Sequence, residues 1–247
     1  SCPPTNDDGE LRESGQECPH SLVAASGENS ESGQEYPRSP FLDLSQPIAQ
    51  YRHVLPHWEQ AGKWVFVTWR LKDSLPIEKL REWREEKTRW LEEHPEPWDA
   101  QTYEDYHRAF SDQINYWLDK GSGTCVLRDP AIGKRVGEVL LHDDGKKIEM
   151  DCFVVMPNHV HTLFRLLPGA SLETVIKSWK GISARRINQQ LGQSGTLWQE
   201  DYWDRLIRSE KHFHRVRRYI RENPQDAGLR KGYFLWERGH SCPPASS

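Results

Sequence analysis

The stretch IEMDCFVVMPNHVHTLFRLL, residues 148–167, decides the fold of this chain. Residues 148–156 and 159–167 are both rich in β-branched and aromatic side chains, which favour strands. Between them stand Pro157 and Asn158, a pair typical of turns. The stretch therefore predicts two consecutive strands joined by a short connection.

Two histidines open the second of these strands. His159 and His161 are two residues apart, so their side chains share one face of the strand while Val160 points to the other. Neutral imidazoles placed side by side are good ligands for a divalent ion. A structural or surface pair explains the spacing equally well, and two ligands leave an ion site incomplete. A third ligand would have to come from elsewhere in the chain.

The rest of the chain alternates between strand and helix patterns around this stretch. The predicted elements are a strand at 64–69, helices at 76–94 and 102–120, a helix at 130–142, a helix at 171–191, a strand at 202–208, and a helix at 210–222 stopped by Asn223-Pro224. This order predicts an α+β fold, a ferredoxin-like (split βαβ) antiparallel sheet with helices on one face. The helical pair at about 76–120 is interpreted as an insertion.

Composition separates three regions of the chain. Residues 1–45 are rich in Ser, Gly, Glu and Pro, a composition that buries too little apolar surface to fold and predicts a disordered tail. Residues 46–238 form the expected domain, and residues 239–247 are expected to form a flexible tail.

Several classes of protein are excluded by composition and motif. Hydrophobic residues make up 36% of the 247 residues, and no apolar run approaches a membrane span, so we expect a cytoplasmic protein. The five cysteines form no Cys-x-x-Cys pair, which argues against a disulfide framework and a zinc–cysteine site. Walker, Rossmann and Ser-His-Asp signatures are absent.

Charge is segregated along the chain despite the net charge of -4. Residues 159–238 hold fifteen Lys and Arg against eight acids, whereas residues 1–50 hold nine acids against two bases. A basic region suits a phosphate-rich partner, although an ordinary solvated surface is an equal alternative. Four tryptophans lie among these cations: Trp179, Trp198, Trp203 and Trp236. Aromatic side chains interleaved with cations are typical of single-strand binding, and core packing is the alternative, above all for Trp198 and Trp203.

Four segments of the chain resemble one protein family. Residues 155–161 (VMPNHVH) resemble the signature of the HUH single-tyrosine transposases, in particular the REP-associated tyrosine transposase branch. Residues 194–199 (SGTLWQ), 202–207 (YWDRLI) and 219–228 (YIRENPQDAG) resemble later segments of that family in the same order. The likeness covers about residues 125–230 and leaves the tail and the insertion outside.

The resemblance implies roles for four residues. Tyr219 would be the nucleophile, and His159, His161 and Asn223 would hold Mg²⁺ or Mn²⁺. Taken alone, Tyr219 also fits a tyrosine at the rim of the core, and Asn223 also fits a residue that ends a helix. Asn223 follows Tyr219 by four residues and would lie on the same helical face.

The function implied is a metal-dependent single-stranded DNA endonuclease and strand transferase. It would act on REP-type hairpin DNA through a 5′-phosphotyrosine intermediate, in the bacterial cytoplasm near the nucleoid, as a monomer or homodimer. Two alternatives stay open: a non-catalytic DNA-hairpin binding protein, and a phosphodiesterase that uses water as its nucleophile.

The candidate DNA contacts are cations of the basic region. Solvent exposure alone accounts for them about equally well. They are Lys177, Lys180, Arg185, Arg186, Arg205, Arg208, Arg217, Arg218 and Arg221.

Overall fold

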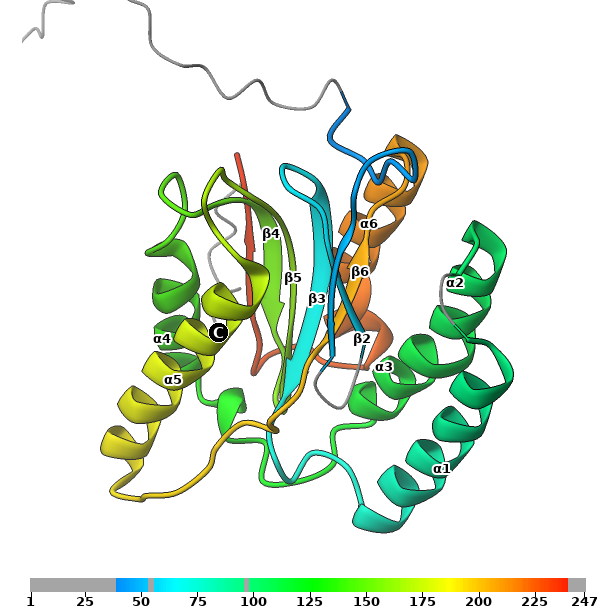
Figure 1. Cartoon of the computed structure of the whole chain (residues 1–247). Coiled ribbons are helices and arrows are strands. Elements are labelled where there is room, and N and C mark those ends of the chain that lie inside the picture. Colours follow the sequence, from blue (N-terminus) through cyan, green and yellow to red (C-terminus); the bar gives the residue numbers. More distant parts are fainter. Residues whose placement is uncertain (1–38, 53–55, 96–97, 240–247) are drawn as a thin grey trace, which may run out of the picture. The chain divides into compact units, whose positions relative to one another are not determined.

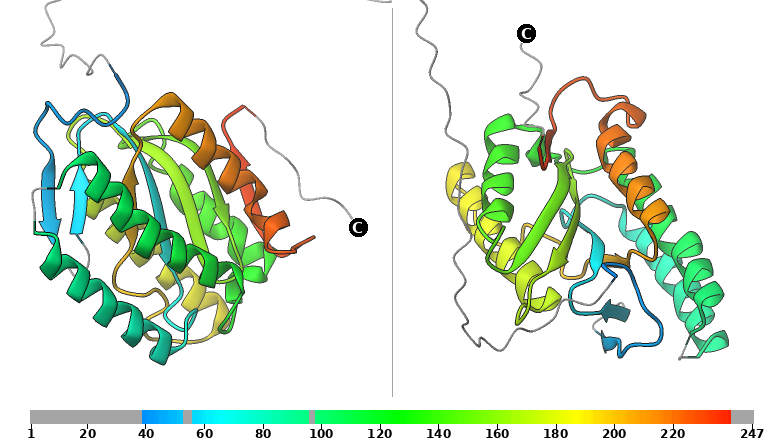
Figure 2. Two further views of the ribbon diagram at one scale, coloured as in Figure 1. Left: turned by 90° about the vertical axis from the view of Figure 1, so that its right-hand side faces the viewer. Right: turned by 90° about the horizontal axis from the view of Figure 1, so that it is seen from above.

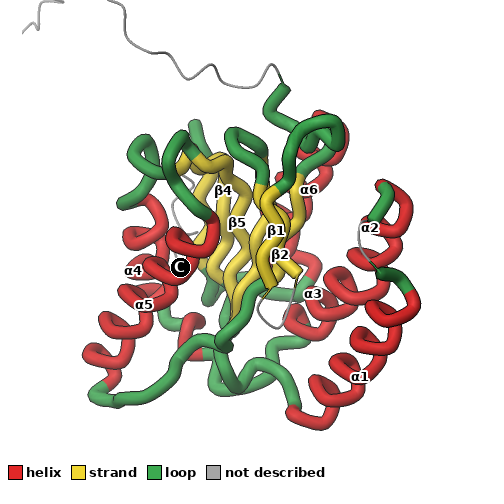
Figure 3. The backbone as a smooth tube through the Cα atoms, viewed as in Figure 1, coloured by secondary structure: helices red, strands yellow, loops and turns green. Residues whose placement is uncertain are grey.

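The computed structural model describes residues 39–52, 56–95 and 98–239, and its centre is a five-stranded antiparallel sheet (Figure 1). The strand order in this sheet is β6-β3-β5-β4-β7. The bounds of its strands are β3 Trp64–Arg70, β4 Ile148–Val155, β5 His159–Leu166, β6 Trp203–Leu206 and β7 Phe234–Glu237. A separate two-stranded sheet pairs β1 (Ala49–Arg52) with β2 (Pro56–Glu59) (Figure 3).

The two strands predicted from residues 148–167 are β4 and β5. They pair antiparallel, and the amide of Met156 donates to the carbonyl of His159 at 2.8 Å to close the connection. Helices pack against this antiparallel sheet, so the predicted α+β fold class is confirmed.

Helices cover both faces of the sheet, which corrects the expectation that they lie on one face (Figure 2). α4 (Pro130–Leu141) and α5 (Leu172–Leu191) lie on one side, and α6 (Glu210–Asp226) lies on the other (Figure 1). Both faces of the central strands are apolar, so each face needs a helical cover.

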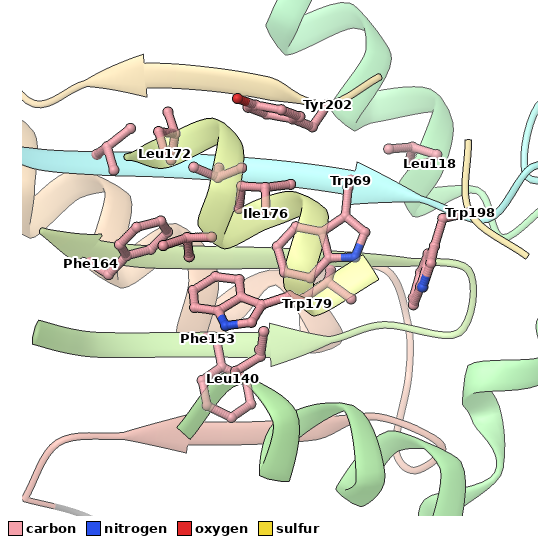
Figure 4. Packing of buried hydrophobic residues seen from close by; sticks show 14 of the residues in the cluster. Trp69, Leu118, Leu140, Phe153, Phe164, Leu172, Ile176, Trp179, Trp198 and Tyr202 are labelled. Carbon is pink, nitrogen blue, oxygen red and sulfur yellow. The ribbon is translucent and has the colours of Figure 1, made fainter. Parts of the chain in front are cut away.

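Two hydrophobic clusters form: the larger covers the face under α4 and α5 and also includes residues of the helical insertion, and the smaller lies under α6. Trp69 and Phe164 pack with Trp179 of α5 in the larger cluster (Figure 4). Phe66 and Leu163 share the smaller cluster with Ile220 of α6. The alternation of side chains along β3 and β5 assigns neighbouring residues to opposite clusters.

Local sequence explains where the last two helices begin and end. The Ser171 hydroxyl accepts from Thr174 N at the start of α5, and Gly192 adopts φ 64° at its end. Ser209 caps α6 in the same way. α6 continues through Pro224 to Asp226, so the prediction that Pro224 stops the helix is wrong. Pro224 has no N–H to donate to the Ile220 carbonyl, and the helix ends two residues later, at Asp226.

The insertion is helical, as predicted. It consists of α1 (Ile77–Glu93), α2 (Ala100–Tyr106), a π-helical turn η1 (His107–Ser111) and α3 (Asp112–Asp119). The chain then reaches α4 through a short 3₁₀ turn, η2 (Val126–Arg128). Buried aromatic side chains hold these helices together; the Trp83 ring meets the Phe110 ring edge-on at 6.0 Å.

Residues 39–45 pack on the domain, although composition assigns them to the tail. The Trp64 amide donates to the Pro40 carbonyl at 2.9 Å, and the Leu42 amide donates to the Ile207 carbonyl at 2.8 Å. Phe41 and Leu42 also contact the two hydrophobic clusters. An average over 45 residues hides this short apolar segment. The expectations for residues 1–38 and 240–247 concern residues outside the described ones.

None of the helices among the described residues is long and apolar enough to cross a membrane.

Candidate active site

The register between β3 and β5 decides which side chains meet. Thr68 faces His161 and Arg70 faces His159 across the two strands. Facing residues of an antiparallel pair point to the same side of the sheet. The two histidines therefore lie under α6, on the side of the smaller cluster, and both are fully buried.

The two imidazoles converge through one nitrogen each. His159 Nε2 and His161 Nε2 are 2.9 Å apart. His159 Nδ1 donates to Asn158 Oδ1 at 2.7 Å, which leaves the Nε2 lone pair of His159 for an ion. His161 Nδ1 lies 2.7 Å from Thr68 Oγ1, a hydroxyl that can donate or accept. Two nitrogen ligands at right angles, each about 2.1 Å from an ion, are about 3 Å apart.

Burial and the neighbouring His159 hold the pKa of His161 well below its usual value. His161 is therefore a neutral imidazole at physiological pH, which is the form that binds metals.

Tyr219 reaches this pair from α6. Its hydroxyl lies 3.2 Å from His161 Nε2, and its ring meets Phe66 edge-on at 6.0 Å. Burial raises the pKa of Tyr219 well above its usual value, and Asp119, Asp112 and Asp226 add to the increase. A hydrogen bond with Asn223 opposes it in part. The phenol is therefore protonated at neutral pH.

Asn223 lies one turn beyond Tyr219 in α6 and is fully buried. Its Nδ2 donates to Asp119 Oδ1 at 3.0 Å. Its Oδ1 is buried and has no hydrogen-bond partner among the described residues. An amide oxygen left in this state costs free energy unless a cation or another donor meets it.

Asp119, the last residue of α3, was not a sequence-based candidate. Its Oδ1 lies 3.5 Å from His159 Nε2, and one ligand atom from each of Asp119, His159 and His161 lies within 4.8 Å of the others. The residue sits in the insertion, outside every segment that resembles the family, so no sequence signal singled it out.

This donor set fits a divalent ion. The two imidazole Nε2 atoms converge, the buried amide oxygen of Asn223 has no partner among the described residues, and the Asp119 carboxylate lies beside the imidazoles. Nitrogen and oxygen ligands in this mixture are typical of sites for divalent metal ions.

A cleft of about 530 Å³ opens beside Tyr219, between the insertion and α6. Its walls carry both charges and one exposed aromatic ring, that of Tyr116. Arg108, Arg215 and Tyr116 line this cleft and were not sequence-based candidates. The sequence did not single out Arg108 and Tyr116, because both belong to the insertion and lie outside the segments that resemble the family.

Four of the predicted DNA contacts are held in ion pairs. Arg205 and Arg208 each approach Glu104 Oε1 to 2.6 Å. Arg217 lies 3.2 Å from Asp151, and Arg221 lies 2.9 Å from Glu237. Arg218 is exposed on α6.

The four predicted contacts on α5 lie on the opposite side of the sheet from Tyr219 (Figure 1). Lys177 and Lys180 line a second groove beside residues 195–202, while Arg185 and Arg186 are exposed. The structure thus gathers the predicted catalytic and metal residues but not these cations.

The tryptophans divide between the two alternatives. Trp179 and Trp198 are buried, and their indole nitrogens donate to Asp143 and Ser183, so both serve the core. Trp203 and Trp236 are only partly buried against the same cluster.

The segment that holds His159, His161, Tyr219 and Asn223 also matches a known family. Residues 126–223 match the family of IS200-like transposases. The resemblance to transposases is therefore confirmed for this segment, which spans 98 of the 247 residues. Asp119 and the rest of the insertion lie before it.

Solved structures that are similar to this chain include two transposases. One is a REP-associated tyrosine transposase bound to a REP hairpin, with 16% identity, coverage of 73% of this chain and 74% of that one, and a TM-score of 0.39. The other is a candidate transposase from Deinococcus radiodurans R1, with 20% identity, coverage of 65% and 89%, and a TM-score of 0.26. No curated protein matches the chain.

Proposed function

We propose that this chain is a metal-dependent single-stranded DNA endonuclease and strand transferase with Tyr219 as its nucleophile. One observation carries the proposal. The Tyr219 hydroxyl lies 3.2 Å from His161 Nε2, which itself lies 2.9 Å from His159 Nε2, inside an IS200-like segment. A phenol beside two imidazoles that can bind a metal ion is an arrangement in which the phenol can be activated as a nucleophile.

In the first half of the reaction, Tyr219 Oη forms a bond to phosphorus and the bond from phosphorus to the 3′ oxygen breaks. The phenol loses its proton, and the leaving 3′ oxygen takes one up as a hydroxyl. The product is a 5′-phosphotyrosine, which keeps the phosphate in an ester. A 3′-hydroxyl of another strand can then reverse the step and join the two ends.

His159, His161 and Asn223 would hold the divalent ion, Mg²⁺ or Mn²⁺. When bound, the ion would stabilise negative charge on the scissile phosphate and favour deprotonation of the phenol. Asn158 and Thr68 orient the imidazoles through the bonds to their Nδ1 atoms. α6 presents the Tyr219 hydroxyl from a rigid helix, so attack needs little rearrangement of the backbone.

The cleft beside Tyr219 would receive the strand. Arg108 and Arg215 lie where phosphates would pass, and the exposed ring of Tyr116 offers a face for an unpaired base. The exposed cations Lys177, Arg185, Arg186 and Arg218 would contact more distant parts of the DNA. The proposed substrate is REP-type hairpin DNA with a single-stranded flank, met in the cytoplasm near the nucleoid.

A labelled single-stranded repeat oligonucleotide, incubated with the protein and Mn²⁺, tests the proposal on a denaturing gel. We expect a covalent protein–DNA adduct that Tyr219→Phe abolishes. Tyr233→Phe is the matched control, because Tyr233 packs on the same hydrophobic cluster and should leave the adduct unchanged. An adduct that persists in Tyr219→Phe would refute the assignment.

The assay also separates the two alternatives. Cleavage without an adduct, unaffected by Tyr219→Phe, would favour water as the nucleophile. Tight hairpin binding with neither cleavage nor adduct would favour a non-catalytic binding protein.

A further inference from the structure

Asp119 is a largely buried carboxylate without a lysine or arginine partner among the described residues. Its side chain is only 22% exposed, and no Lys or Arg among the described residues pairs with it. Its close neighbours are His159, 3.5 Å away, and Asn223, which donates to it at 3.0 Å. A carboxylate withdrawn from water normally needs a cation or several donors.

The position of Asp119 relative to the histidines is anchored by the chain that follows it. Asn158 Nδ2 donates to the Ser122 carbonyl at 2.9 Å, and Asn158 Oδ1 accepts from His159 Nδ1 at 2.7 Å. One side chain therefore ties the end of the insertion to the first histidine of β5. Fully buried Ile114 and Leu118 anchor α3 in the larger hydrophobic cluster.

From this arrangement, and resting on the proposed function, we propose that Asp119 is an anionic ligand of the ion held by His159, His161 and Asn223. The insertion thereby completes the metal site of the IS200-like segment. Two imidazoles and an amide are neutral, so Asp119 would supply the only negative charge among these four ligands.

The charge of the proposed site sets its strength of binding, and the ligand types set its preference among divalent ions. A carboxylate strengthens the binding of any divalent ion, whereas imidazole ligands suit Mn²⁺ better than Mg²⁺. The site is therefore expected to bind Mn²⁺ more tightly than Mg²⁺. The negative charge near Tyr219, which opposes formation of the phenolate, is offset when a cation shares the site.

Direct metal binding tests this inference without DNA or turnover. Calorimetric titration of the full chain carrying Tyr219→Phe with Mn²⁺ provides the reference affinity. Loss of a partner that merely orients a ligand weakens metal sites by about 10- to 100-fold. Asp119→Asn keeps the shape and the acceptor for Asn223 but removes the charge, and it should weaken Mn²⁺ binding by at least about tenfold. His159→Ala should abolish binding.

Asp112→Asn is the matched control. Asp112 lies two turns earlier in α3, lines the same cleft and also raises the pKa of Tyr219, but it is outside the ion cluster. The same loss of charge there should change Mn²⁺ affinity by less than about threefold, because a charge farther from the ion is screened. Equal effects at both positions would show a general field effect and overturn the assignment.

Cobalt distinguishes a ligand from a residue that orients one. If Asp119 binds the ion, Asp119→Asn should change the visible absorption band of bound Co²⁺, and Asp119→Glu should restore part of the Mn²⁺ affinity. An unchanged band with unchanged affinity in Asp119→Asn would overturn the inference while leaving the proposed function intact. Failure of the reference protein to bind Mn²⁺ would overturn both.

Discussion

Thr68 Oγ1 lies 2.7 Å from His161 Nδ1, on the neighbouring strand of the sheet. This bond decides where the opposite nitrogen of the ring points, because an imidazole is planar. The pairing of β3 with β5 therefore fixes the orientation of the proposed ion site.

Thr68→Val keeps the shape of this residue and removes the hydroxyl. We expect Mn²⁺ affinity to fall by about tenfold and the free energy of unfolding to fall by about 1–3 kcal/mol, because a buried ring nitrogen loses its partner. Thr162→Val is the control. Thr162 is also fully buried, but it bonds the Val67 carbonyl on the other face of the sheet. Calorimetry and thermal melting should show a stability cost in both variants and a metal defect only in the first.

The raised pKa of His57 leads us to expect that the protein loses stability at alkaline pH. Burial lowers the pKa of this imidazole, but hydrogen bonds to Asp201 and Asp204 outweigh burial and raise the pKa to about 9. Since the folded pKa exceeds the unfolded value of 6.5, the stabilisation is complete below about pH 6.5 and disappears as the pH rises through about 9. The pKa difference corresponds to on the order of 3 kcal/mol.

Thermal melting between pH 6 and 10 checks this linkage. The melting temperature should fall most between pH 7 and pH 9 in the unaltered chain. His57→Gln should melt lower at pH 6 and show a flatter pH profile. An unchanged slope in His57→Gln would mean that another group is responsible.

Glu104 is expected to weaken DNA binding, because it holds Arg205 and Arg208 in ion pairs. Glu104→Gln should release both cations toward phosphate. Affinity for a hairpin with a single-stranded flank should rise, and the log-log salt slope should steepen by about 0.7 per added phosphate contact. Glu85→Gln removes the same charge from the same insertion, at an exposed pair with Arg81, and should change neither quantity. Equal behaviour of the two variants in fluorescence anisotropy would contradict this role.

Truncations locate the start of the domain. Removal of residues 1–38 should leave the melting temperature nearly unchanged, as their composition predicts. Removal of residues 1–45 breaks the hydrogen bonds of Pro40 and Leu42 and exposes the surface beneath Phe41. A loss of about 1–3 kcal/mol and a drop of several degrees are expected for the longer truncation. Equal melting temperatures for the two truncated proteins would show that residues 39–45 contribute nothing.

Local patterns in the sequence determined much of the site. The spacing of His159 and His161 places both rings on one face of a strand, and the spacing of Tyr219 and Asn223 places both on one face of a helix, since period and pitch depend only on near neighbours. The same reasoning located the two strands at 148–167 and the helical insertion. The family resemblance added the proposed roles of these four residues, in a segment that the family match also covers.

Only the tertiary structure decided what surrounds them. Asn223 and Asp119 lie 104 positions apart and hydrogen-bond through their side chains, and Glu104 meets Arg205 from 101 positions away. No local period encodes such contacts, because they depend on how α3 and α6 pack over the sheet. The second helical layer was missed for the same reason: an apolar strand shows that both of its faces are covered, but not which segment covers each. The carboxylate beside the histidines therefore became visible only once the chain was folded.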